Sequence, residues 1–284
     1  GADVVTLETE WGTVFTPDQI EDAVKAHGPK LVALVHAETS TGVLQPVADI
    51  ARLAKENGAL MMLDTVSSLG GIEVKVDEWG IDAIYSGTQK CLSCTPGMSP
   101  VSFSERSVEL ITSRKTKVQS WFLDTNLVMG YWGPNAKRAY HHTAPVNALY
   151  SLHESLVMLQ EEGLENSWAR HYNNHLALRA GLEAMGLSFI VDEAHRLPQL
   201  NSVTIPEGID EASVRSRLLN EFNLEIGAGL GALAGKVWRI GLMGHSSRAE
   251  NIFLCLSSLE AVLNEMGAEI NTGAALEAAQ SAMK

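Results

Sequence analysis

Three short apolar runs, each followed by small or polar residues, constrain the fold of this chain more than any other feature. They span residues 31–35, 60–63 and 81–85, and they have the length and β-branched or aromatic character of buried strands. An amphipathic segment at 47–57 lies between the first two runs and stops before Gly58. Strands that are apolar throughout and alternate with helices indicate a mainly parallel sheet covered on both faces. The sequence therefore predicts an α/β fold.

Two charged side chains stand just after these runs. Asp64 follows the second run, and Lys90 follows the third after Ser86-Gly87. Ligands of open α/β sheets sit beyond the carboxyl ends of the strands, so both side chains face a predicted site. Residues 83–98 supply no charged partner for Lys90, and a lysine held there in low dielectric shifts towards its neutral, nucleophilic amine. An ordinary solvated loop lysine is the alternative.

An aspartate and a lysine at two such strand ends suit pyridoxal phosphate. The lysine amine can form a Schiff base with the aldehyde of this cofactor. The aspartate carboxylate can keep the pyridine nitrogen protonated, so that the ring accepts the electrons of a substrate carbanion. The pair Asp64 and Lys90 therefore predicts a site for this cofactor.

Seven segments occur in the order and approximate spacing of one known family. They read L-D-T-V-S-S-L-G-G, Y-S-G-T-Q-K, H-A-E-T-S-T-G-V-L-Q-P, S-R-K-T-K, Y-H-H-T, G-L-E-N-S-W and G-K-V-W-R-I-G-L-M-G. The chain resembles the alanine–glyoxylate aminotransferases, in the class V branch of the fold-type I pyridoxal-phosphate enzymes, with serine–pyruvate and serine–glyoxylate aminotransferases nearby. The resemblance implies transamination between alanine or serine and a 2-oxo acid, glyoxylate or pyruvate. It also implies a large cofactor-binding domain at 1–163 and a small α+β domain at 164–284.

The same resemblance assigns roles to individual residues. Lys90 forms the aldimine with pyridoxal 5′-phosphate and then shuttles a proton between substrate and cofactor. Asp64 holds the ring nitrogen, and Thr39 lies near the phenolic oxygen. The phosphate contacts are Gln89 and, from the neighbouring subunit of a homodimer with its active site at the interface, Tyr140 and Thr143.

Arg239 is the candidate substrate ligand. It interrupts an apolar strand run at 236–241, and its planar fork suits a carboxylate held by two parallel hydrogen bonds. The resemblance implies that it binds the α-carboxylate of the amino acid. A structural arginine paired with one of the 34 acidic residues is the alternative. Residues 227–232 fit G-x-G-x-x-A, but a strand follows where a dinucleotide site needs a helix, so no such site is expected.

Composition excludes several classes of function. A formal net charge of −13 argues against nucleic-acid binding, and the one basic cluster at 114–117 is too short to change this. No apolar run approaches the roughly 18 residues of a membrane span. Cys91, Cys94 and Cys255 are an odd number without framework spacing, which favours a reducing, cytoplasmic compartment. Cys91 and Cys94 form C-x-x-C, but without a second pair a redox or metal role is disfavoured.

Two histidines at helical spacing raise the question of a metal site. His171 and His175 lie one turn apart on a helix expected at 166–185, yet H-Y-N-N-H lacks the glutamate of the H-E-x-x-H pattern. We therefore expect them on a solvent-exposed helix face. His36 and Glu38 follow the first strand, where we expect a polar turn that satisfies its own backbone.

The chain begins part-way through the family pattern. Residues 1–7 already read as a strand, and the front portion of the relatives, which supplies a phosphate-binding helix start and an aromatic ring contact, has no counterpart here. We therefore expect the 284 residues alone to dimerise poorly or bind cofactor weakly. The alternative function is a non-catalytic or incomplete subunit that keeps the fold. A lyase or desulfurase of this fold would need a mobile catalytic cysteine, which the resemblance does not supply.

Overall fold

A four-stranded sheet organises the first lobe of the molecule. The computed structural model describes residues 2–132 and 140–283. The strand order is β1–β4–β5–β6; β1, β4 and β5 are parallel, and β6 pairs antiparallel with β5 at the edge. These strands are β1 (Leu31–Val35), β4 (Leu60–Asp64), β5 (Ala83–Tyr85) and β6 (Val101–Phe103). The predicted parallel sheet is confirmed for the three apolar runs.

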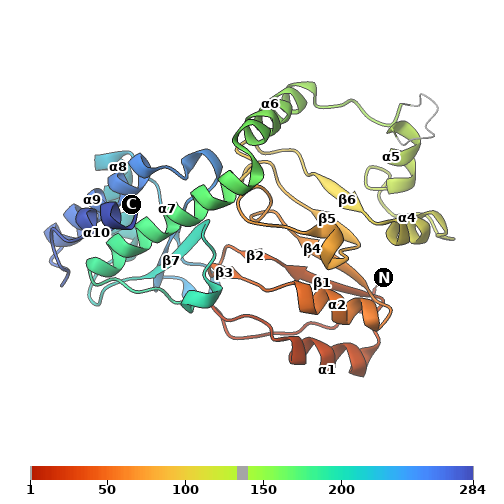
Figure 1. Ribbon diagram of the computed structural model, residues 1–284, viewed down its shortest axis with the longest axis horizontal. Coiled ribbons are helices and arrows are strands. Elements are labelled where there is room, and N and C mark those ends of the chain that lie inside the picture. The colour runs from red at the N-terminus through yellow and green to blue at the C-terminus, as the bar shows by residue number, and fades with distance from the viewer. Residues whose placement is uncertain (1, 133–139, 284) are drawn as a thin grey trace.

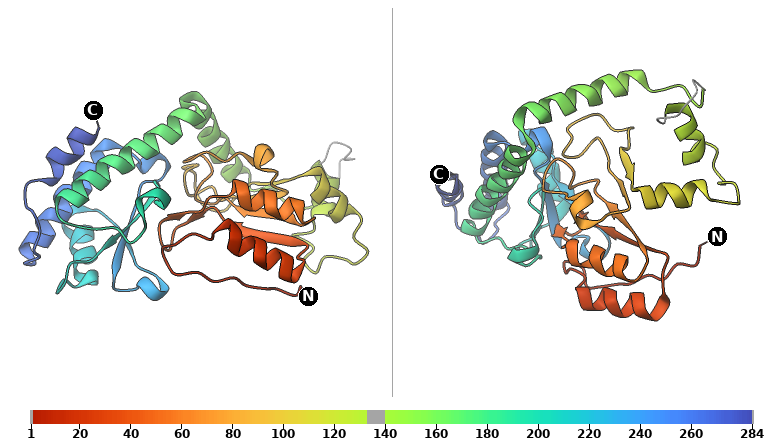
Figure 2. Two further views of the ribbon diagram at one scale, coloured as in Figure 1. Left: turned by 60° about the horizontal axis from the view of Figure 1, so that its bottom comes forward. Right: turned by 45° about the vertical axis from the view of Figure 1, so that its right-hand side comes forward.

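Helices α1 (Pro17–His27) and α2 (Ala48–Glu56) cover one face of this sheet (Figure 2). Apolar side chains of both helices, among them Ile20 and Ile50, pack against Met61 and Leu63 of β4. The first helix begins with a capping box in which Thr16 and Gln19 satisfy each other's backbone N–H.

The opposite face of the sheet carries no helix among the described residues, which corrects the expectation that both faces are covered. Its outward-pointing side chains are nevertheless apolar: Leu31 is 45% exposed and Val101 is 53% exposed, and Val35, Tyr85 and Phe103 are exposed as well. Because both faces are lined by apolar residues, the strands look fully buried in the sequence. Only the packing distinguishes the covered face from the open one.

Four further helices belong to the first lobe. They are α3 (Val76–Trp79), α4 (Glu105–Thr112), α5 (Thr125–Trp132) and α6 (Val146–Glu162). Of these, α3 packs Val76 and Trp79 against the sheet core. Figure 1 shows α5 and α6 at the periphery of the first lobe, and no residue of α6 is buried within the described chain. Residues 2–10, expected to begin with a strand, form no regular element and pair with none of the strands in the described ranges, so that expectation is wrong.

The second lobe packs helices against a small antiparallel sheet of order β7–β9–β8. Trp238 at its centre is fully buried. The strands are β7 (Leu200–Thr204), β8 (Gly227–Ala228) and β9 (Val237–Gly241), and the helices are α7 (Leu164–Ala184), α8 (Glu211–Phe222), α9 (Ala249–Glu265) and α10 (Ala275–Ala282). Short 3-10 turns lie at η1 (Glu193–His195), η2 (Gly231–Leu233) and η3 (Gly244–Ser246).

Helix α7 places both of its histidines inside the protein, so the expectation of a solvent-exposed pair is wrong. His171 is 0% exposed and His175 is 3% exposed. The His175 ring Nδ1 lies 2.7 Å from the Asn201 side-chain oxygen, and His171 bonds to two backbone groups. Polar side chains on this helix are buried because polar groups of other elements satisfy them.

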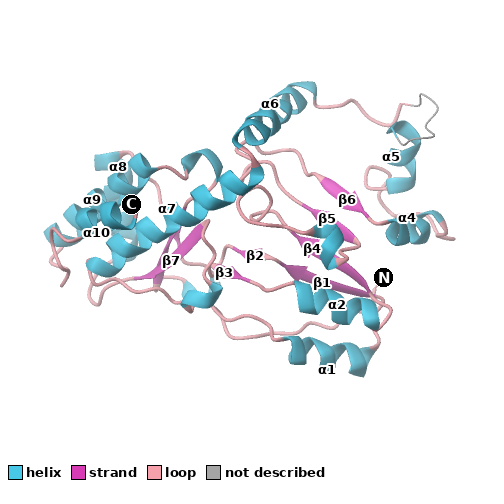
Figure 3. Cartoon of the chain, viewed as in Figure 1, coloured by secondary structure: helices cyan, strands magenta, loops and turns pink. Residues whose placement is uncertain are grey.

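The two lobes meet at a short hairpin, β2 (Ala37–Glu38) and β3 (Val43–Leu44), which Figure 3 shows between them. Ala37 and Leu44 pack with Leu197, Leu200 and Met243 of the second lobe. Gly42 adopts φ +82°, and a Cβ there would lie 2.9 Å from the Leu200 carbonyl oxygen. This close backbone approach fixes the turn that follows β1 against the second lobe.

Candidate active site

Asp64 is the last residue of the central strand β4. Its neighbours in register are Val35 of β1 and Tyr85 of β5, so the carboxylate lies at the carboxyl edge of the three parallel strands. One carboxylate oxygen accepts the Val66 backbone N–H over 2.8 Å, which holds the side chain in place. Burial and the neighbouring Asp64 carboxylate raise the pKa of Tyr85 to about 12. The Tyr85 phenol is therefore neutral at physiological pH.

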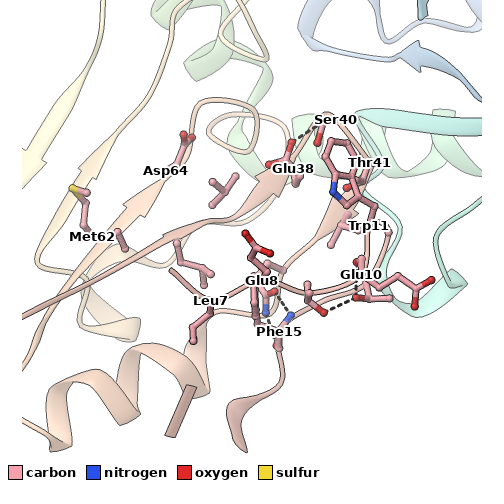
Figure 4. Close-up of a pocket in the computed structure, with 18 of the residues that line it drawn as sticks. Leu7, Glu8, Glu10, Trp11, Phe15, Glu38, Ser40, Thr41, Met62 and Asp64 are labelled. Atoms are coloured by element: carbon pink, nitrogen blue, oxygen red, sulfur yellow. Dashed lines mark hydrogen bonds between the residues drawn. The ribbon is translucent and has the colours of Figure 1, made fainter. Parts of the chain in front are cut away.

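A cavity of about 680 Å³ lies beside Asp64. The open sheet face forms its floor through Ala33, Val35, Met62 and Tyr85. Residues 7–13 and the turn after β1 form the other walls, and Figure 4 shows Glu38, Thr41 and Trp11 around the opening. The volume is within the range of pockets that hold a cofactor or a drug-sized ligand.

Trp11 in this wall was not singled out by the sequence. Gly231 of the second lobe packs directly on it: a Cβ at Gly231, which has φ +52°, would lie 2.4 Å from the indole. Tyr85 was missed as well, although its strand-end position in register with Asp64 follows once β4 and β5 are paired. The sequence could not single out Trp11, because its place in the cavity wall depends on its contact with Gly231 of the other lobe.

Lys90 lies in the loop that follows β5. Backbone bonds shape this loop: Ser93 N–H donates to the Lys90 carbonyl over 3.0 Å, and Cys94 N–H donates to the Thr88 carbonyl over 3.0 Å. Lys90 is half-buried and has no carboxylate within 4.0 Å of its amine among residues 2–132 and 140–283. It lines a second hollow, of about 410 Å³, to which Met243 and His245 also contribute. Gln89 beside it is exposed and lines the same hollow.

Arg239 on β9 reaches across to the first lobe. Its Nη1 donates to the Thr39 carbonyl oxygen over 2.9 Å, and its Nε donates to the Ala228 carbonyl over 2.7 Å. Within the described part of the chain, no acidic side chain pairs with this guanidinium, and Nη2 makes no hydrogen bond. The alternative of a structural arginine paired with an acid is therefore not found among the described residues. The Nη2 group of the guanidinium is left for a ligand.

The structure does not bring Tyr140 and Thr143 to the hollows beside Asp64 and Lys90. Their hydroxyls bond to each other, and both residues are exposed, Tyr140 at 74%. The neighbouring His141 ring stacks on Trp121 with 4.0 Å between ring centroids. These residues belong to the peripheral segment between α5 and α6, and residues 133–139 of that segment are not among the described residues.

The turn after β1 was expected to satisfy its own backbone through His36 and Glu38, and only Glu38 does so. Glu38 accepts the Ser40 backbone N–H over 2.7 Å and so satisfies its own turn. His36 does not, because its Nδ1 is buried and finds no hydrogen-bond partner in residues 2–132 and 140–283, and its ring packs edge-on against Trp79. Burial lowers the pKa of His36 to about 4.

The cysteines are all free thiols. Cys91 and Cys255 are buried, whereas Cys94 is half-buried and bonds through its thiol to Ser151 over 3.4 Å. No group of three or more metal-ligating side chains comes together in the described ranges. None of the helices found there is long and apolar enough to cross a membrane.

The chain belongs to the class-V aminotransferase family, whose model matches residues 1–251. It is 43% identical to the (S)-ureidoglycine–glyoxylate transaminase of Bacillus subtilis over 98% of this chain and 71% of that protein. It is 42% identical to the alanine–glyoxylate aminotransferase of Callithrix jacchus over 93% of this chain and 64% of that protein. The chain thus spans about two thirds of the length of these relatives.

Solved structures show the same relationship. The ureidoglycine–glyoxylate aminotransferase of Bacillus subtilis matches with a TM-score of 0.96 and 45% identity, covering 99% of this chain and 72% of that one. An alanine–glyoxylate aminotransferase from Nostoc sp. matches with a TM-score of 0.90 and 49% identity, covering 93% of this chain and 69% of that one. The fold is the α/β fold-type I of pyridoxal-phosphate aminotransferases.

Proposed function

We propose that this chain forms the cofactor and substrate site of a pyridoxal-phosphate aminotransferase that moves an amino group between a small amino acid and glyoxylate. The observation that carries the proposal is that Asp64 ends the central parallel strand and Lys90 lies in the loop after the next strand, so both stand at the carboxyl edge of the sheet, although they line separate hollows. The names of the relatives, which act on ureidoglycine or alanine with glyoxylate, support the choice of acceptor.

The residues beside Asp64 fit pyridoxal 5′-phosphate. One oxygen of the carboxylate accepts the Val66 N–H, and the neutral Tyr85 phenol lies beside the carboxyl group, so Asp64 is held as a negatively charged partner for a protonated ring nitrogen. Asp64 lines the cavity of about 680 Å³. Asp64, Thr39 and Gln89 would hold the group within this chain.

The bound cofactor supplies an electron sink for the substrate carbanion. Lys90 supplies the amine that holds it and, when released, carries the proton removed from the substrate Cα, because its amine has no carboxylate partner in the described structure. Arg239 orients the substrate by its α-carboxylate, since two backbone carbonyls already fix the guanidinium. Tyr85 stays protonated beside Asp64 and adds no competing negative charge.

We also propose that the site is completed in a homodimer, in which Tyr140 and Thr143 serve the neighbouring copy. Both are exposed and line neither hollow of their own chain, and α6 beside them exposes Tyr150 at 73% and Met158 at 53%. Helix α6 buries no residue in a single copy of the chain, so we expect the neighbouring copy to cover its exposed apolar side chains. The domains are 1–163 and 164–284, divided at the Gly163 junction of α6 and α7.

Borohydride trapping tests the cofactor assignment. Protein incubated with pyridoxal 5′-phosphate and then reduced should carry one stable adduct, mapped by peptide mass spectrometry to Lys90. Lys90→Ala should carry none, whereas the control Lys75→Ala, a surface lysine paired with Glu73, should label normally. An adduct on any other lysine, or none, would overturn the assignment and favour the non-catalytic alternative.

Mixed dimers test the contribution from the neighbouring copy. One copy carries Lys90→Ala and the other carries Tyr140→Phe with Thr143→Ala. If the hydroxyls act across the interface, one site of each mixed dimer is wholly normal and regains tight cofactor labelling. If they act within their own chain, both sites are defective and the mixture labels no better than its parents.

A further inference from the structure

The loop after β9 lies directly on the lysine loop. Gly244 adopts φ +55°, and a Cβ there would lie 1.9 Å from the Ser93 hydroxyl oxygen and 3.0 Å from the Cys91 carbonyl oxygen. The His245 backbone N–H donates to the same Ser93 hydroxyl over 2.7 Å. Ser93 itself is held at φ +57°, three residues after Lys90. The second lobe therefore touches the lysine segment through turn η3.

Helix α7 holds turn η3 from the other side. His171 Nε2 accepts the Gly244 backbone N–H over 2.8 Å. Arg170 Nη1 donates to the Gly244 carbonyl over 2.8 Å and to the Ser247 carbonyl over 3.0 Å, and Arg170 is itself paired with Glu162. The turn is thus clamped between the start of α7 and Ser93.

The hydrogen bonds of His171 specify its protonation state. Nδ1 lies 2.7 Å from the Ser167 carbonyl, which can only accept, so Nδ1 carries the proton. Nε2 must then keep its lone pair, because the Gly244 N–H donates to it. The ring is completely buried, and burial lowers its pKa. A neutral imidazole is therefore built into this contact.

The same helix end also holds the segment that follows Asp64. The Ser167 hydroxyl donates to the Gly70 carbonyl over 2.7 Å, and both groups are buried. Gly71 lies against the Cys91 sulfur, where a Cβ would come within 2.5 Å. The first turns of α7 thus touch both the segment after Asp64 and, through η3, the segment after Lys90.

We propose that His171 is a positioning residue for Lys90, which it fixes through Gly244 and Ser93. The imidazole touches neither substrate nor cofactor; it sets the backbone of the lysine loop by accepting one buried N–H. Loss of that acceptor leaves the Gly244 N–H buried and unpaired, so the turn moves to find another partner. Ser93 and the lysine loop then lose their fixed neighbour. The catalytic part of this proposal rests on the role proposed for Lys90.

Amide hydrogen exchange of the protein without added cofactor tests the mechanical link. In His171→Leu the Ser93, Cys94 and His245 amides should exchange at least about tenfold faster, because their bonds depend on the clamped turn. His175→Leu is the matched control: it removes an equally buried histidine one turn away that bonds Asn201 instead. Unchanged exchange in His171→Leu, or equal acceleration in His175→Leu, overturns the proposal.

Two further variants keep the test decisive if His171→Leu folds poorly. His171→Gln supplies an uncharged oxygen acceptor and should restore slow exchange at His245. Ser93→Ala removes the other side of the contact at an exposed position and should speed exchange at His245 while leaving peptide 60–64 unchanged. Failure of either expectation contradicts the link.

Borohydride trapping then separates the two proposals. Pyridoxal phosphate should be trapped on Lys90 at least about tenfold more slowly in His171→Leu than in the unmodified chain, and His171→Gln should recover most of that rate. If the unmodified chain shows no trapping on Lys90, the proposed function fails while the exchange result still stands. If exchange responds but trapping on Lys90 does not slow, His171 is structural and its positioning role is wrong.

Discussion

The Arg239 guanidinium donates to the backbone carbonyl of Thr39 over 2.9 Å, joining residues 200 positions apart in the chain. A second bond, from Nε to the Ala228 carbonyl, fixes the plane of the fork. The arginine is therefore oriented by one carbonyl from each lobe, and Nη2 points to no protein acceptor among the described residues. Carboxylate binding by arginine depends on this planar geometry, so the packing of the two lobes orients Arg239 for the carboxylate that we propose it binds.

Arg239→Lys should weaken amino-acid binding by roughly 10- to 100-fold, because a lysine cannot reproduce the oriented fork. Cofactor trapping on Lys90 should persist. Binding is measured by titrating the cofactor-loaded protein with alanine and following its visible spectrum. Arg217→Lys, at an exposed pair with Glu221 on α8, is the control and should bind normally. Equal affinity in both variants would reassign Arg239 to structure.

Asp64→Asn should slow transamination by about 100-fold or more, since the amide cannot hold a protonated ring nitrogen. A second readout needs no cofactor: removal of the carboxylate should lower the pKa of Tyr85 below its present value of about 12. Ultraviolet titration of tyrosine ionisation, compared with a Tyr85→Phe variant, measures it. Asp49→Asn, at an exposed pair with Arg52, should change neither quantity. An unaltered Tyr85 titration would show that the two groups do not interact.

Gly244→Ala should destabilise the protein by more than about 2 kcal/mol, because a methyl group there overlaps the Ser93 hydroxyl as well as straining a positive φ. Gly267→Ala isolates the strain alone: Gly267 has φ +77° and open space around it, so about 1 kcal/mol is expected. Urea unfolding gives both free energies. Adding Ser93→Gly to Gly244→Ala should recover part of the loss, and strict additivity of the two changes would contradict the contact.

Cys94 should react with maleimide well before the other two thiols. Slight burial opposes ionisation, but hydrogen bonding with Ser151 and Thr95 prevails and lowers its pKa, whereas burial raises the pKa of Cys91 and of Cys255 to about 12. Timed labelling of the native protein, followed by peptide mass spectrometry, should show one fast site. Ser151→Ala should slow it. Early labelling of Cys91 would mean that the lysine loop opens readily.

Acid should destabilise the fold through two buried histidines. Burial lowers the pKa of His36 and of His175 to about 4, against about 6.5 when unfolded. Below pH 6.5 the unfolded chain therefore binds more protons than the folded chain, so stability falls as the pH drops to about 4 and levels off below it. Each histidine contributes roughly 3 kcal/mol of this loss.

Urea unfolding from pH 7 to pH 4, for the native chain and for His175→Gln and His36→Gln, checks this dependence. Each variant should lose stability less steeply over that range than the native chain, even if it is less stable at pH 7. Parallel curves would show that the two histidines do not carry the acid sensitivity.

Much of the framework was determined by the sequence alone. Short apolar runs of strand length, separated by an amphipathic helical segment, placed β1, β4 and β5, because apolar residues of this length and type favour strands in a sheet. Asp64 and Lys90 followed from those strand ends, since polar residues mark where the chain leaves the sheet. These are local consequences of backbone geometry and solvation, and they need no knowledge of distant contacts.

Tertiary structure alone decided the rest. In the sequence His171 and His175 suggest a solvent-exposed helix face, because polar side chains usually lie on the surface. Their burial is favourable because the Ser167 carbonyl and the Gly244 N–H bond to His171, and the Asn201 side chain bonds to His175. The open sheet face and the bond between Arg239 and Thr39 are equally invisible in the sequence. A single chain records which residues are apolar or polar, but the partner that satisfies each buried polar group is chosen only when distant segments pack together.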